Sequence, residues 1–332
     1  MASGALATGA SDATPPGGVL RPFQLARDLR GVVRLIERAF AGEDADDRLL
    51  PQEVLALQLA APFLRAAGVL LPAARDLFAG FVWEQDGQIV GNVTLGRLGG
   101  DATRWMIGNV AVDPAYRRAG IARRLTTAAL AEIERRGGRV TILDVRADNA
   151  AAYALYRSLG FMRIDQTLEL RRPELRAPQS GPSCIRPLRA REWRALAALL
   201  DAAAPDLVRR FTPVQEQQVM ATTLAASLGI VGRLLTGVQS TILVAERNGR
   251  LAGAAEIEIR GRGTAHRLKL TIHPAARGTV EEDLVAGALA FLPTGTVRAD
   301  VRASESAAEA ALFRAGFTAV RTLDRLAYAH PS

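Results

Sequence analysis

The sequence predicts an α/β protein made of two similar domains in tandem. Three observations indicate this architecture. Each half opens with a short strand followed at once by a helix, each half contains a strong hairpin signal, and three segments recur in the same order about 160 residues apart, a period that suits a duplicated domain. A length of 332 residues is comfortable for two domains of about 150 residues each.

Residues 1–18 precede the first strand and show neither helical nor strand periodicity. They are small, polar and rich in Pro and Gly, with Asp12 as their only charged side chain, and they lack the basic start and apolar centre of a signal peptide. We expect a disordered leader here. Because Cys184 is the single cysteine, no intrachain disulfide can form, and we expect a cytoplasmic protein.

Each half then gives a strand and two helical regions. Apolar residues recur at steps of three and four in these regions, as on one face of a helix. The expected elements are a strand at 20–23 with helices at 29–40 and 51–67, and a strand at 184–187 with helices at 193–203 and 213–235.

A β-hairpin follows in each half. Asp86-Gly87 and Asn248-Gly249 lie between β-rich runs, and both dipeptides tolerate the positive φ angles of a tight hairpin turn. The expected strands are 78–84 with 88–95, and 241–247 with 250–259.

The recurring segments are the closest match between the halves. Val110–Ala115 corresponds to Leu270–Ala275, Leu143–Ala147 to Ala299–Ala303, and Leu159–Phe161 to Ala315–Phe317. The segment between the copies contains three prolines and is linker-like in composition. The predicted organisation is a leader at 1–18, a first domain at 19–172, a linker at 173–182 and a second domain at 183–332.

One strand-to-helix turn in the first domain suggests chemistry. A strand at 106–112 ends before Asp113-Pro114, and a helix starts near Ile121. Gly120 and Ala122 carry no side chain that would block the amides of the first helical turn, which can bind a pyrophosphate at the positive end of the helix dipole. On its own, a glycine with arginines at a helix start is more often plain structure, and the turn lacks the Gly-Lys-Ser/Thr of a P-loop.

A second segment makes the pattern specific. Arg117-x-x-Gly120-x-Ala122 resembles the [Gln/Arg]-x-x-Gly-x-[Gly/Ala] acyl-CoA motif of the GNAT acyltransferase superfamily, and Asn149-x-x-Ala152-x-x-x-Tyr156-x-x-x-Gly160-Phe161 resembles its second motif. The resemblance covers residues 19–172 well and 184–330 in eroded form. It implies two GNAT-like domains, each with a mixed, mostly antiparallel, splayed sheet flanked by helices.

The resemblance also implies a co-substrate, acetyl-CoA, and an N-acetyltransferase activity without a metal. The pantetheine arm would pair with the strand backbone at Val110 and Val112, where an amide would polarise the thioester carbonyl. Asn149 would bind the pantetheine, and Tyr156 would protonate the departing thiolate. The implied acetyl-CoA contacts are Val110, Ala111, Val112, Arg117, Arg118, Ala119, Gly120, Ile121, Ala122, Arg123, Asn149 and Tyr156.

Structural interpretations of the same residues stay open. Asn149 is also a natural helix N-cap, and Tyr156 is also a natural core residue. No carboxylate lies on the strand where the family often places a general base; Glu84, Asp144 or a water held by Asn109 are the alternatives. The acidic run 43–47 could attract a cationic amine, although a solvated loop explains it as well.

The second copy has lost these features. In the second half, Arg277-Gly278-Thr279-Val280 replaces the phosphate turn, and the sequence predicts a turn that is one residue shorter. Three carboxylates follow at 281–283. Glu305 stands opposite Asn149, and Leu312 opposite Tyr156. We expect a degenerate domain that keeps the fold and binds no acyl-CoA.

Composition restricts the function classes. The net charge is +8, but 41 of the 42 basic residues are arginines scattered in ones and twos, because Lys269 is the only lysine; this argues against nucleic-acid binding. Three histidines and one cysteine make no usual metal cage, and no apolar run approaches a membrane span. The sequence predicts a small-molecule or peptide amine as acceptor. A non-catalytic acyl-CoA sensor or scaffold is the alternative, and a homodimer is left open.

Overall fold

The computed structural model describes residues 17–41, 79–98, 101–175, 181–227, 238–261 and 264–331. The described chain forms two compact units: unit 1 takes in 17–41, 79–96 and 105–137, and unit 2 takes in 97–104 and 138–331 with the gaps given above. Residues 1–16 of the expected leader, the expected helix at 51–67 and the acidic run 43–47 lie outside the described residues.

Unit 1 carries the first strands and the first strand-to-helix turn. Its elements are β1 (Val19–Pro22), α1 (Leu25–Ala39), β2 (Ala79–Gln85), β3 (Gln88–Arg97), β4 (Arg104–Val112), the short 3-10 helix η2 (Pro114–Tyr116) and α4 (Ile121–Arg135).

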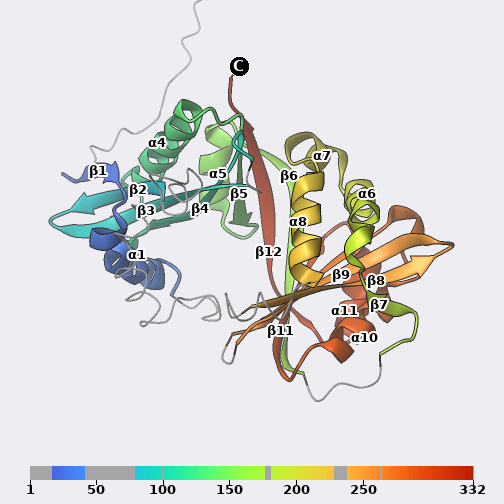
Figure 1. The fold of residues 1–332 in the computed structure, drawn as a ribbon. Coiled ribbons are helices and arrows are strands. Elements are labelled where there is room, and N and C mark those ends of the chain that lie inside the picture. Colours follow the sequence, from blue (N-terminus) through green and yellow to red (C-terminus); the bar gives the residue numbers. More distant parts are fainter. Residues whose placement is uncertain are drawn as a thin grey trace, which may run out of the picture. The chain divides into compact units, whose positions relative to one another are not determined.

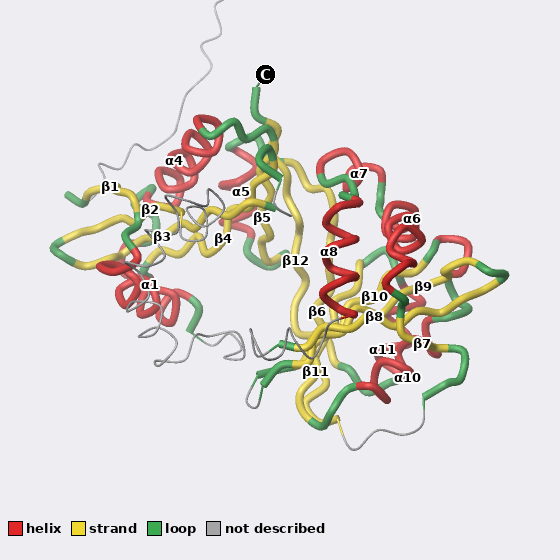
Figure 2. Tube along the Cα trace, in the orientation of Figure 1, coloured by secondary structure: helices red, strands yellow, loops and turns green. Residues whose placement is uncertain are grey.

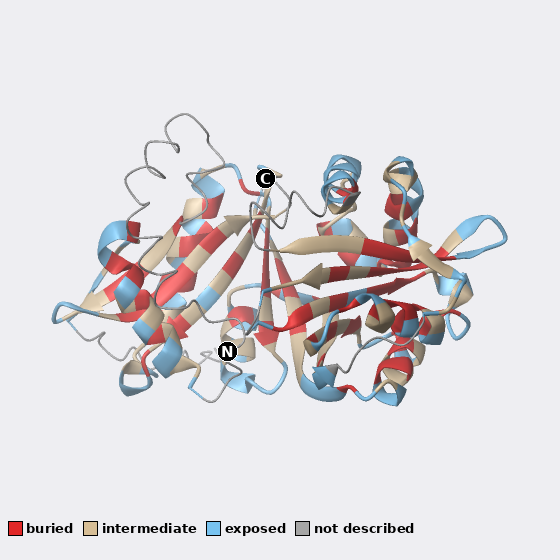
Figure 3. Cartoon of the chain, turned by 60° about the horizontal axis from the view of Figure 1, so that its bottom comes forward, coloured by how far each residue is buried: buried red, intermediate tan, exposed pale blue. Residues whose placement is uncertain are grey.

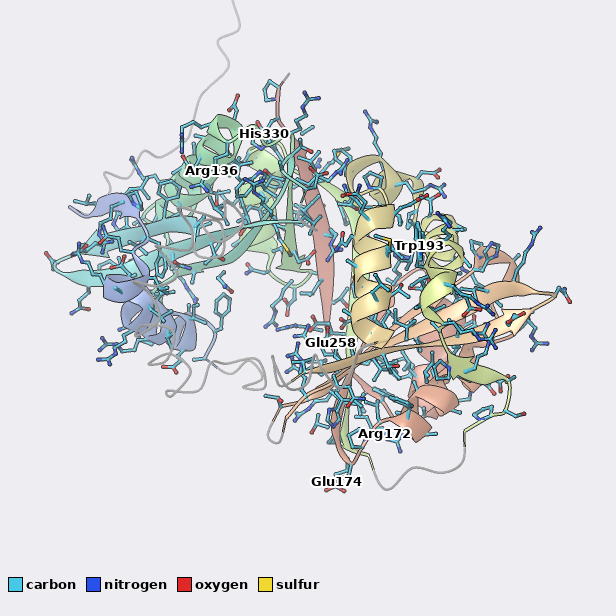
Figure 4. The ribbon with its side chains drawn as sticks, in the orientation of Figure 1. Arg136, Arg172, Glu174, Trp193, Glu258 and His330 are labelled. Atoms are coloured by element: carbon cyan, nitrogen blue, oxygen red, sulfur yellow. The ribbon has the colours of Figure 1, made fainter. Side chains whose placement is uncertain are left out.

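The sheet of unit 1 has the strand order β1-β2-β3-β4. Its hairpin forms as predicted, since Asp86 and Gly87 both have positive φ (50° and 73°) and β2 pairs antiparallel with β3. Helices α1 and α4 lie on opposite faces of this sheet (Figure 1). At the end of α4, Arg136, labelled in Figure 4, lies 5.6 Å above the ring of the buried Trp105.

Unit 2 contains the remaining elements. They are β5 (Val140–Arg146), α5 (Ala150–Ser158), β6 (Met162–Leu175), β7 (Ile185–Pro187), η3 (Ala190–Glu192), α6 (Trp193–Ala203), α7 (Asp206–Phe211), α8 (Glu216–Ser227), β8 (Gln239–Arg247), β9 (Arg250–Ile259), β10 (His266–Ile272), η4 (Pro274–Ala276), α10 (Glu281–Phe291), β11 (Gly295–Arg302), α11 (Ser306–Arg314) and β12 (Thr318–Ala329).

The sheet of unit 2 runs in the order β5-β12-β6-β11-β10-β9-β8-β7 (Figure 2). Only β10 and β11 are parallel; the other six neighbouring pairs of this described sheet are antiparallel. The two half-chains exchange their last strands. β12 from the second half pairs with β5 of the first, and β6 from the first half pairs with β11 of the second.

Alternation along the strands gives this sheet two apolar faces. Leu243 and Ala245 belong to a core with the residues of α10 and α11, whereas Ile242 and Val244 belong to a core with those of α6 and α8. Successive side chains of a strand point to opposite faces, so a helix layer covers each face. Four consecutive residues of β8, 242–245, are buried as a result, and Figure 3 shows buried stretches along the strands of this sheet.

The structure changes the predicted boundary between the halves. The expected linker at 173–182 begins inside β6, because that strand continues to Leu175 through its pairing with β11. The compact units also divide the chain elsewhere than the repeat does: unit 2 takes over after Gly137, whereas the repeat divides the chain between residues 172 and 183. Local sequence patterns locate strands but do not give their partners, and here the partners decide the division.

Candidate active site

The strand end that should meet the pantetheine is distorted in unit 1. Asn109 interrupts β4 with a φ of 49°, directly before Val110, Ala111 and Val112. Its carbonyl accepts a hydrogen bond from Nδ2 of Asn92, 3.1 Å away on β3. A positive φ inside a strand re-aims the backbone groups that follow it, as bulges near active sites do.

The turn after β4 has an open backbone at the start of a helix. Arg118 and Gly120 both have left-handed φ angles, 69° and 74°, and α4 begins at Ile121. The first helical hydrogen bond of α4 runs from Arg124 N to Gly120 O (3.1 Å). The backbone amides that come before Arg124 in the first turn therefore lie outside the hydrogen-bond ladder of the helix. Apart from the neighbouring backbone, no heavy atom of the described residues lies within 4 Å of where a Cβ would stand on Gly120.

The charges around this turn suit an anion. The first turn of α4 contains no acidic residue, and Arg118, Arg123 and Arg124 are exposed on it. Arg117 behaves differently from the expectation, because its guanidinium donates to the carbonyl of Ala39 (3.0 Å) at the end of α1. The backbone turn and the other arginines therefore fit a pyrophosphate, while the side chain of Arg117 is held by a helix C-terminus.

Asn149 lies in unit 2 at the start of α5. It is the N-cap, and its Oδ1 accepts from Ala152 N (3.1 Å), which confirms the capping interpretation. Its side chain is exposed, and the Nδ2 group takes no part in the cap. The same residue can therefore cap the helix and donate to a ligand carbonyl.

Tyr156 is a core residue of unit 2. It is 6% exposed and packs edge-on against Phe161, with ring centroids 5.8 Å apart. Burial raises the pKa of Tyr156 to about 12. The phenol is therefore protonated throughout the neutral range, the form required of an acid. Its burial agrees equally with the structural interpretation.

Two of the candidate bases are engaged in ion pairs. Glu84 accepts from Arg21 (2.6 Å) and Arg27 (2.8 Å), and Asp144 accepts two hydrogen bonds of 2.8 Å from Arg325. Both carboxylates are therefore already bound to guanidinium groups. The water that Asn109 could hold is the remaining candidate of the three.

The corresponding turn of the second half corrects the predicted alignment. Four residues separate η4 from α10, and four separate η2 from α4, so the second turn is not shorter. Gly278 stands at the position of Arg118 and shares its left-handed φ (81°), while Val280 stands at the position of Gly120 with a φ of −127°. Matching Gly278 to Gly120 would give the wrong alignment, because the left-handed residue that corresponds to Gly278 is Arg118, which is not a glycine.

The second turn already contains an anion. The carboxylate of Glu281 accepts from Gly278 N (2.7 Å) and Val280 N (3.0 Å), and the residue is 3% exposed. Of the other two carboxylates, Glu282 pairs with Arg314 (2.6 Å) and Asp283 accepts from Cys184 Sγ (3.5 Å). Glu281 therefore occupies the amides of this turn.

The helix after β11 matches α5 position by position. Glu305 is the N-cap of α11 without a side-chain capping bond, and Leu312 is fully buried. The Glu305 carboxylate is 3% exposed and makes no hydrogen bond to the described residues, and its nearest cations, Arg277 and Arg302, are each 3.9 Å away. Burial raises its pKa.

Sequence reasoning missed Asn92. Its side chain is fully buried, and its Oδ1 has no partner among the described residues, although Nδ2 holds the Asn109 carbonyl. An asparagine between the apolar residues Val90 and Val93 was the available signal, because a buried amide needs partners.

Two kinds of feature are absent from the described part of the chain. These contain no group of three or more His, Cys, Asp or Glu side chains able to hold a metal ion. None of the described helices is long and apolar enough to cross a membrane.

Similar sequences bear on the family. Residues 53–161 match the Acetyltransferase (GNAT) family. Mycothiol acetyltransferase of Amycolatopsis mediterranei is 37% identical over 153 residues, which is 46% of this chain and 49% of that protein. The [ribosomal protein bS18]-alanine N-acetyltransferase of Escherichia coli is 55% identical over 53 residues, 16% of this chain and 36% of the relative. The chain thus spans about half the length, or less, of these curated relatives.

Solved structures share the fold across nearly the whole chain. A GCN5-related N-acetyltransferase from Sphaerobacter thermophilus has a TM-score of 0.66 at 16% identity, covering 96% of this chain and 98% of the other. A tandem GNAT protein from the clavulanic acid biosynthesis pathway has a TM-score of 0.59 at 17% identity, covering 95% and 99%. Residues 53–161 therefore match the GNAT family, and the fold of nearly the whole chain is that of GNAT proteins.

Proposed function

We propose that this protein transfers an acetyl group from acetyl-CoA to a primary amine, and that its first half alone binds the acetyl-CoA. The observation that carries the proposal is the turn at 117–121. It offers first-turn amides, two left-handed residues and no carboxylate, whereas Glu281 fills the equivalent turn of the second half.

Residue roles follow the implied assignments. The turn from Arg118 to Arg123 holds the pyrophosphate, with the amides of Ala119, Gly120, Ile121 and Ala122 facing it. The backbone at Val110, Ala111 and Val112 holds the pantetheine and polarises the acetyl carbonyl, and the Asn109 distortion orients that backbone. Acetyl-CoA supplies an acyl group activated as a thioester.

Tyr156 would stabilise the sulfur as it leaves. A phenol with a pKa near 12 is a weaker acid than a thiol, whose pKa is roughly 8.5. Tyr156 therefore donates a hydrogen bond to the developing thiolate more readily than it releases its proton. Asn149 supports the same ligand from the start of α5 through its Nδ2 group, and the acceptor amine enters neutral or loses its proton to water.

The acceptor class is tested with purified protein, acetyl-CoA and a panel of amines, by measuring free thiol release. The names of two relatives suggest two acceptors for this panel: deacetylated mycothiol, and peptides that begin with alanine. Turnover with a primary amine is expected. Acetyl-CoA binding without turnover on any amine would favour the sensor or scaffold alternative.

Stoichiometry tests the second part of the proposal. Titration calorimetry of the intact chain with acetyl-CoA should give one site. The intact chain is the right sample, because a fragment starting near residue 183 would lack β6, the partner of β11 and β12. Two equivalent sites would contradict the assignment to the first half.

A further inference from the structure

Unit 2 contains a pocket that none of the acetyl-CoA residues line. Its volume is about 240 Å³, and it lies between the helix layer of α6 and α8 and the strands β8, β9 and β10. This is below the roughly 300–1,000 Å³ of pockets for drug-sized ligands. The pocket therefore suits a molecule of amino-acid size.

The floor of the pocket is one row of cross-strand neighbours. Ile242 on β8 stands opposite Glu256 on β9, which stands opposite Lys269 on β10. Directly opposed residues share one face of a sheet, so the floor changes from apolar to acidic to basic along the row. Leu196, Leu200 and Val219 line the helix side.

The charged end of this floor is a weak ion pair. Lys269 Nζ lies 3.4 Å from Glu256 Oε1, and the side chains are 56% and 31% exposed. Exposed pairs of this kind contribute little, about 0–1 kcal/mol. A ligand can therefore replace the pair, provided that it leaves neither charge without a partner.

That condition selects the ligand. A ligand with an ammonium and a carboxylate can pair with both Glu256 and Lys269, whereas a ligand with one charge can pair with only one of them. Its apolar substituent would lie against Ile242 and the leucines of α6. We propose that this pocket binds a small zwitterion with an apolar substituent, an α-amino acid in size and charge.

The probe is L-leucine, titrated into the full chain by calorimetry or ligand-observed NMR. Isoamylamine and isovalerate carry the same apolar group with a single charge each, and both should bind more weakly. Glu256→Gln and Lys269→Gln should each reduce the affinity for L-leucine by about tenfold or more, the effect of losing a charged hydrogen bond. Glu258→Gln is the matched control, two residues along the same face of β9 and outside the pocket lining (Figure 4).

A second pair of variants tests the pocket by its shape. Thr222 is exposed on α8 and lines the pocket, and its neighbour Ala221 is exposed and does not. Thr222→Trp should abolish L-leucine binding, and Ala221→Trp should leave it unchanged. Failure of L-leucine to bind, equal affinity for the singly charged probes, or binding unaffected by Thr222→Trp would each overturn the proposal. Acetyl-CoA binding uses other residues, so its loss or retention is a separate result.

Discussion

The turns at 117–121 and 277–281 have equal lengths and lead into equivalent helices, yet they treat their first-turn amides differently. In the first, Gly120 and the arginines leave the amides to a ligand; in the second, the chain folds Glu281 back onto its own amides at 2.7 and 3.0 Å. The comparison teaches that such a turn can hold a carboxylate of its own chain and keep its fold, because a carboxylate stabilises a helix N-terminus as an anionic ligand does.

A carboxylate placed in the turn at 117–121, like the one in the turn at 277–281, should have the largest effect on acetyl-CoA affinity. In Gly120→Glu, a carboxylate about 4 Å from a phosphate would repel it by about 4 kcal/mol at an effective dielectric near 20, nearly a thousandfold in affinity. Calorimetry with acetyl-CoA measures this. Gly137→Glu is the matched control, since Gly137 at the other end of α4 is equally open and left-handed (φ 78°). Equal loss of acetyl-CoA affinity in both variants would show that backbone strain, and not charge repulsion at the turn, causes the effect.

The second half has Leu312 at the position of Tyr156, so the two halves also differ at the residue proposed to act on the sulfur. Tyr156→Phe removes the hydroxyl and keeps the packing against Phe161, so kcat should fall by about 10²–10⁴-fold with little change in acetyl-CoA affinity. Tyr153→Phe, one turn earlier on α5, should retain activity. Full turnover of Tyr156→Phe, measured where chemistry limits the rate, would make Tyr156 a structural residue like Leu312.

The two N-caps, Asn149 and Glu305, should respond in opposite directions. Asn149→Ala loses the bond to Ala152 N and should lower the free energy of unfolding by about 1 kcal/mol, in addition to any loss of cofactor affinity. Denaturant unfolding measures the first effect and calorimetry the second. Stability equal to that of the unmodified protein would show that the cap bond contributes nothing.

Glu305→Gln should instead stabilise the protein at pH 7, by about 1 kcal/mol, because an amide loses less hydration energy on burial than a carboxylate. The raised pKa of Glu305 means that the folded state holds its proton to higher pH than the unfolded state. The stability that this proton provides is present below the ordinary pKa of 4.5 and is lost as the pH rises through the folded-state value. Thermal unfolding against pH checks this. Glu282→Gln, at a mostly exposed carboxylate, should leave the profile unchanged.

The sequence predicted those features that short-range chemistry decides. The hairpin at Asp86-Gly87 and the helix cap at Asn149 form as predicted, because each depends on a few adjacent residues. The exchange of β6 and β12 was not predictable, since strand periodicity does not identify the partner strand. The contacts of Arg117 with Ala39 and of Glu281 with its own turn depend on side-chain conformations that only the packed structure selects.

The exchange of last strands has a consequence for synthesis on the ribosome. β5 has left the ribosome long before its neighbour β12 at 318–329, and about 170 residues separate the two. At roughly 5–20 residues per second this interval lasts about 10–30 s. During that time the edge of β5 is open to other strands, which is a hazard for aggregation. The nascent first half therefore cannot complete the pairing of β5 until β12 has been synthesised.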